Sequence, residues 1–132
     1  MLPRWFRRKD RPLTGAPAVR RQKTYSAQSG FVYQYFYQGQ RPSSPEPGTE
    51  FVFDVSADRR TSSPVTVLVT AEAVENWERL ANRALSSTEL YAVAKMALFQ
   101  AFDERATPEA MREAVRLTPA GVQTILANLN ID

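Results

Sequence analysis

An arginine-rich segment at the start of the chain carries the side chains best suited to binding an anion. Residues 1–23 hold eight basic side chains and one acid, a net charge of +7, whereas the rest of the chain holds nine basic and thirteen acidic side chains, a net charge of −4. Arginine holds phosphate or carboxylate through two parallel hydrogen bonds and stacks on nucleobases. The candidate polyanion-binding residues, which include one aromatic ring between arginines, are Arg4, Trp5, Arg7, Arg8, Lys9, Arg11, Arg20, Arg21 and Lys23.

Two kinds of partner fit this basic arm. A short basic segment joined to a mildly acidic body is typical of an arm that has its own partner. Nucleic acid or a ribonucleoprotein is the first interpretation, because neutralised phosphates give tight, salt-dependent binding with weak sequence preference. The alternative is a structural or assembly subunit whose arm docks on a neighbouring subunit of a protein complex. An arm without any defined partner is the third interpretation.

Catalytic and metal-binding chemistry find little support in the sequence. The chain has no cysteine and no histidine, which removes thiol catalysis, the commonest metal ligands and the Ser-His-Asp triad. It has no glycine-rich phosphate-binding loop. The remaining catalytic candidates are Lys95 in an apolar segment, the neighbours Asp103 and Glu104, and the carboxylates Glu50 and Asp54. We therefore expect a non-enzymatic protein without a cofactor or a bound metal.

The first half of the body predicts strands. Residues 30–38, 50–56 and 65–70 are rich in aromatic or β-branched side chains and are separated by turn-forming stretches. Their order indicates a three-stranded antiparallel meander. In the first strand, Phe31, Tyr33, Tyr35 and Tyr37 alternate onto one face, where they could stack on single-stranded bases or form the core under the helices. We favour the core, and the mixed opposite face suggests a cover supplied by the arm or by a second copy of the chain.

The second half predicts about four helices. Thr70 is placed to cap a helix over 71–85, and Ser86 with Glu89 has the spacing of a capping box for a helix over 88–105. The second of these is apolar nearly all round, so it is either the central helix of the fold or an oligomer contact. Thr107-Pro108 and Thr118-Pro119 each signal a further short helix. A DNA-reading helix-turn-helix over 108–129 is disfavoured, because no basic residue follows Val122.

These patterns predict an α+β fold with a three-stranded meander, about four helices on one face and an extended basic arm. We expect the arm over residues 1–24 and one domain over residues 25–132. No stretch of the sequence is apolar enough to cross a membrane, and none reads as a secretory signal, so we expect a cytoplasmic protein. The function expected from the sequence is that of a small binding module that contacts nucleic acid through its arm and that could form a homo-oligomer through the helix over 88–105.

Overall fold

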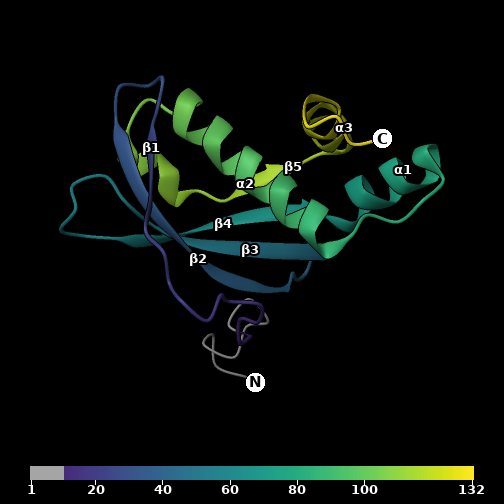
Figure 1. Cartoon of the computed structure of the whole chain (residues 1–132), viewed down its shortest axis with the longest axis horizontal. Coiled ribbons are helices and arrows are strands. Elements are labelled where there is room, and N and C mark those ends of the chain that lie inside the picture. Colours follow the sequence, from purple (N-terminus) through teal and green to yellow (C-terminus); the bar gives the residue numbers. More distant parts are fainter. Residues whose placement is uncertain (1–10) are drawn as a thin grey trace.

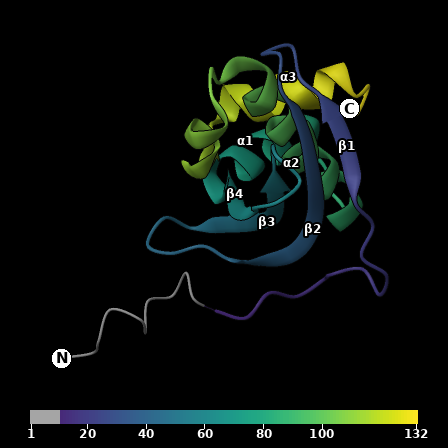
Figure 2. The same ribbon diagram turned by 90° about the vertical axis from the view of Figure 1, so that its left-hand side faces the viewer.

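A curled five-stranded sheet with three α-helices on one face forms the body of the molecule (Figures 1 and 2). The computed structural model describes residues 11–132. The fold is α+β, as the sequence predicts. The elements in chain order are β1 (Lys23–Ser26), β2 (Val32–Pro42), β3 (Gly48–Ser56), β4 (Ser63–Thr70), α1 (Ala71–Ala81), α2 (Ser87–Glu104), the 3-10 helix η3 (Pro108–Arg112), β5 (Val115–Leu117) and α3 (Pro119–Asn128).

The strands lie in the sheet in chain order, β1-β2-β3-β4-β5. Strands β1 to β4 pair antiparallel, so the predicted meander over β2, β3 and β4 is present. Strand β5 pairs parallel to β4, with Val67 opposite Val115. Helices α1, α2 and η3 lie between these two strands in the chain and provide the crossover that a parallel pair requires.

Aromatic rings from β2 and α2 build one end of the core. Tyr33 is 1% exposed and stacks on Phe102 of α2, with ring centroids 4.2 Å apart. Tyr35 meets Phe99 edge-on, and Tyr37 packs beside Tyr91. The prediction that these strand aromatics form the core under the helices is confirmed, because alternate residues of β2 face the helical layer.

Helix α2 is the central helix of the fold. Six of its residues are buried within this chain, and its other apolar residues pack against the core, including Met96 and Phe99. The predicted capping box is present, with Ser86 and Glu89 each bonding the other's backbone N–H. Thr70 caps α1 as predicted, and Thr107 and Thr118 each cap a helix that begins with proline. Within residues 11–132, no helix combines the length and apolar character that a membrane crossing requires.

The prediction of a short helix after Thr107 is wrong beyond the first helical turn. Pro108–Arg112 forms a 3-10 helix, and Val115–Leu117 is strand β5. The Arg105 guanidinium donates hydrogen bonds to the carbonyl oxygens of Ala110 and Glu113, at 2.8 and 2.7 Å. The edge of β4 also needs a partner for its backbone groups, which β5 supplies. The pair of helices considered for helix-turn-helix binding is therefore absent.

The described part of the arm is joined to the edge of the sheet. Strand β1 begins at Lys23, so the boundary expected between residues 24 and 25 falls within a strand that pairs with β2. Further upstream, Thr14 and Gln40 exchange two backbone hydrogen bonds of 2.9 and 2.8 Å. The eight residues 15–22 thus lie opposite only four residues of β2, 36–39, and bulge away from it. Leu13 and Thr14 lie against Gly39, so this part of the arm packs on the edge of the sheet beside β2.

Candidate anion-binding surface

The basic residues predicted to bind a polyanion fall into two groups. Arg4, Trp5, Arg7, Arg8 and Lys9 lie outside the described residues. The other four are exposed and form no ion pair with any residue of 11–132: Arg11, Arg20, Arg21 and Lys23. Elsewhere in the body, Arg41, Arg83 and Arg116 each pair with a glutamate at 2.6 to 2.9 Å. The described arm is thus a stretch of positive charge that this part of the chain leaves uncompensated.

The arm presents its cations to both sides of the sheet edge. Arg20 places its guanidinium over the Phe36 ring, 4.6 Å from the centroid, on the face of the sheet turned away from the helices. Arg21 and Lys23 instead line a cavity on the helical side. Because successive side chains of an extended segment point in opposite directions, one short basic stretch reaches both faces.

We call the cavity on the helical side the tyrosine groove. It has a volume of about 320 Å³ and is lined by Gly15, Pro17, Val19, Arg21, Lys23, Tyr35, Tyr37 and Tyr91. A second hollow of about 290 Å³ continues it along the start of α2 and shares Gly15, Tyr37 and Tyr91 with it. No carboxylate lines either space among the described residues. The groove therefore offers cations and aromatic rings to a ligand without a competing negative charge.

The tyrosine hydroxyls of this groove stay protonated at neutral pH. Burial raises the pKa of Tyr35 and of Tyr37 to about 12, and the neighbouring Tyr91 adds to the shift. Each hydroxyl is thus available as a hydrogen-bond donor to an anion. The rings of Tyr37 and Tyr91 are partly exposed and suited to stacking on planar ligands, whereas the Tyr35 ring is buried in the core.

Positive charge also accumulates beside the groove. The pKa of Lys95 on α2 is lowered, first by burial and second by the positive charge of Lys23. The Lys95 ammonium lies 5.8 Å from the centre of the Phe99 ring, and no carboxylate of residues 11–132 pairs with it. A bound anion would reduce the electrostatic repulsion between these two ammonium groups. This favours an anion site on this side of the arm.

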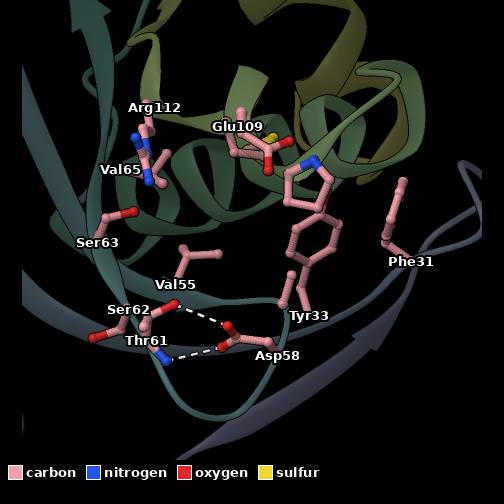
Figure 3. Close-up of a pocket in the computed structure, with 13 residues that line it drawn as sticks. Phe31, Tyr33, Val55, Asp58, Thr61, Ser62, Ser63, Val65, Glu109 and Arg112 are labelled. Carbon is pink, nitrogen blue, oxygen red and sulfur yellow. Dashed lines mark hydrogen bonds between the residues drawn. The ribbon is translucent and has the colours of Figure 1, made fainter.

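A third cavity, drawn in Figure 3, has a mixed charge. It has a volume of about 280 Å³ and lies between the loop that joins β3 to β4, strand β2 and η3. Asp58 accepts hydrogen bonds from the backbone N–H groups of Thr61 and Arg60, which hold its pKa at about 2. Glu109 and Arg112 from η3 lie on the opposite side of the cavity (Figure 3). This cavity does not extend the basic surface, because acids line both of its sides.

The catalytic candidates do not converge on one site. Asp103 accepts hydrogen bonds from the Tyr25 hydroxyl and the Gln28 backbone, at 2.8 and 2.9 Å, and so joins β1 to the end of α2. Glu50 pairs with Arg41, and Asp54 accepts a hydrogen bond from Ser62. Glu104 is exposed, and Lys95 lies on the helical side of the sheet. Residues 11–132 contain no cluster of three or more acids positioned for a metal ion.

Sequence reasoning did not assign four residues to this surface that the fold brings there, and it considered Lys95 only as a catalytic candidate. Tyr91 and Lys95 approach the arm from α2, and Arg59 and Arg60 approach the outer face of the sheet from the loop between β3 and β4. The adjacent arginines in a turn-forming stretch were a visible signal for the second pair, since a turn leaves such side chains in solvent.

No protein-family model, curated protein or solved structure matches this chain.

Proposed function

We propose that this chain is a non-enzymatic binding module that holds nucleic acid along its arginine-rich arm. The observation that carries the proposal is the tyrosine groove, in which Arg21 and Lys23 face three tyrosine rings and no described carboxylate. Phosphates would pair with the cations, and unstacked bases would pack on the partly exposed rings of Tyr37 and Tyr91. Because most bases of a duplex are stacked and inaccessible to these rings, we propose single-stranded nucleic acid as the ligand.

Charge-neutral substitution in the groove tests this proposal. Binding of a 5′-labelled single-stranded nonamer is measured by fluorescence anisotropy over a series of KCl concentrations, for the full chain and for the double variant Arg21→Gln/Lys23→Gln. Each phosphate contact on a single strand contributes about 0.7 to the slope of log Kd against log salt. The variant is therefore expected to bind more weakly and to reduce that slope by about 1 to 1.5.

A matched control removes two charges elsewhere. Arg79→Gln/Arg112→Gln takes the same charge from α1 and η3, where both side chains are exposed. It should leave the affinity and the salt slope close to those of the unmodified chain. An unchanged affinity and slope for the groove variant would overturn the proposal. So would the absence of binding at low salt together with a salt-resistant oligomer in sedimentation, which is the result expected of an assembly subunit.

A further inference from the structure

The face of the sheet turned away from the helices contains a second cavity beside the arm, which we call the outer pocket. It has a volume of about 360 Å³ and is lined by Gln22, Gln34, Phe36, Asp54, Ser56, Arg59, Arg60, Thr61 and Ser62. That volume lies within the range of about 300–1,000 Å³ typical of small-ligand sites. The lining residues come from the arm, from strands β2 and β3, and from the loop between β3 and β4.

One buried polar atom of this pocket has no partner. Gln34 is only 5% exposed, and its Oε1 atom accepts no hydrogen bond from any residue of 11–132. A buried carbonyl oxygen that accepts no hydrogen bond destabilises the free protein. Such atoms are therefore rare unless a ligand or a water molecule donates the missing hydrogen bond. Because Gln34 lies in the wall of the pocket, rotation of its side-chain amide would bring this buried oxygen to a ligand that carries an N–H group.

An aromatic surface lies next to this acceptor. Phe36 follows Gln34 by two residues, so both side chains point to the same face of β2. The Arg20 guanidinium lies over the Phe36 ring, 4.6 Å from its centroid, so a base that stacks on this ring takes the place of that guanidinium. Asp54 lies directly opposite Phe36 on β3 and adds a second acceptor, one oxygen of which already accepts a hydrogen bond from Ser62. A flat ring with amino hydrogens therefore fits the middle of the pocket.

Positive charge borders the outer end of the pocket. Arg59 and Arg60 are exposed, and neither guanidinium forms an ion pair with a described residue. The loop that carries them is held in shape by its own contacts: Ser56 Oγ accepts from the Arg59 N–H at 2.9 Å, and Asp58 accepts from the Arg60 N–H at 2.8 Å. Two free arginines on a fixed loop can bind a phosphate next to the ring.

We infer that the outer pocket holds one nucleotide of a single strand, with a base that carries an exocyclic amino group. The amino group donates to Gln34 Oε1 and to the Asp54 carboxylate, the base stacks against Phe36, and Arg59 and Arg60 hold the adjacent phosphate. The inference rests on the proposed function and assigns it a base-selective subsite. Cytosine fits this description, whereas thymine presents a carbonyl oxygen where cytosine presents its amino group.

Three labelled strands with the same number of phosphates test the subsite. They are an oligodeoxycytidine nonamer, an oligothymidine nonamer and an abasic strand, measured by anisotropy at pH 7.5. The unmodified chain should bind the cytidine strand about fivefold or more tighter than the thymidine strand, which is the least that two good hydrogen bonds to a base provide. It should bind the abasic strand most weakly of the three.

Variants of the pocket separate the roles of its residues. Gln34→Leu should reduce the difference between cytidine and thymidine, because only the Asp54 carboxylate then accepts from the amino group, and a Gln123→Leu control on the exposed face of α3 should preserve the full difference. Phe36→Leu should weaken both base-bearing strands about fivefold or more and leave the abasic strand unchanged. Arg59→Gln/Arg60→Gln changes only exposed side chains, so its effect does not depend on refolding, and it should weaken all three strands.

The outcomes distinguish the subsite from the function on which it rests. Equal affinity of the unmodified chain for the cytidine and thymidine strands would overturn the subsite, and so would a preference that Gln34→Leu leaves unchanged in size. In both cases the arm would still be supported as the nucleic-acid contact if the Arg21→Gln/Lys23→Gln variant bound the abasic strand more weakly than the unmodified chain does. Failure of the unmodified chain to bind any of the three strands at low salt would overturn both proposals.

Discussion

Replacement of Tyr33 by phenylalanine is expected to stabilise the protein. The Tyr33 side chain is 1% exposed, and its hydroxyl has no hydrogen-bond partner in the described part of the chain. Phenylalanine keeps the ring that stacks on Phe102 at 4.2 Å and removes only the oxygen. An unsatisfied buried donor costs about 1–3 kcal/mol, and part of this penalty disappears with the hydroxyl.

We therefore expect Tyr33→Phe to raise the free energy of unfolding by about 1–2 kcal/mol. For a domain of this size the corresponding rise in Tm is roughly 3–8 °C. Urea denaturation followed by tryptophan fluorescence gives the free energy, and circular dichroism gives the Tm. Tyr37→Phe is the matched control, because its hydroxyl borders the open tyrosine groove and should change stability by less than about 0.5 kcal/mol.

A loss of 1 kcal/mol or more in Tyr33→Phe would refute this reasoning, since it would mean that the hydroxyl is bonded in solution. Burial raises the pKa of Tyr33 and the negative charge of Glu109 adds to this shift, so Glu109 is a candidate acceptor. A second substitution, Glu109→Gln, would then reduce the loss, and the pair would show a coupling energy in a double-mutant cycle.

Two further predictions concern alkaline pH and the docking of the arm. Because burial raises the pKa of Tyr35 and Tyr37 to about 12 in the folded state, these hydroxyls ionise earlier in the unfolded chain, and stability should fall between pH 10 and pH 12. The loss is at most about 2–3 kcal/mol per tyrosine, and urea melts at pH 9 and pH 11.5 would measure it; equal stability at both would contradict the assignment. Gly39→Ala places a Cβ 2.6 Å from the Thr14 carbonyl oxygen at a residue whose φ is +124°, so it should cost about 1–3 kcal/mol and detach the arm. Limited trypsin digestion should then cleave after Arg20 and Arg21 faster than in the unmodified chain, and an unchanged rate would exclude docking through Thr14.

Features encoded by neighbouring residues were predictable from the sequence. The capping box of Ser86 and Glu89 needs residues only three positions apart, so the local sequence is enough to predict it. Strand β5 was missed because its partner residues on β4 are 48 positions earlier in the chain, as the pairing of Val67 with Val115 shows. The side chains of Val115–Leu117 continue a helical pattern, and only the unpaired edge of β4 makes a strand the better solution.

The candidate site was predictable in part for the same reason. The basic arm is a local pattern of charge, so Arg20, Arg21 and Lys23 could be identified directly. The distribution of these cations over the two faces of the sheet depends on the bulge between Thr14 and β1, which follows from long-range pairing. The approach of the β3–β4 loop to the outer face of β2 is likewise a property of the folded sheet.

The three-residue strand β5 also shapes how the chain reaches its folded state during synthesis. Strand β4 leaves the ribosome with three apolar side chains that become fully buried, Val65, Val67 and Val69, and with one edge unpaired. That edge stays open until residues 115–117 have left the ribosome, when β5 can pair with it and Thr70 can donate a hydrogen bond to the Leu117 carbonyl. A nascent or truncated chain that stops before β5 therefore exposes a β-branched strand to other chains, which is a template for aggregation. The short strand thus closes an edge prone to self-association as well as completing the sheet.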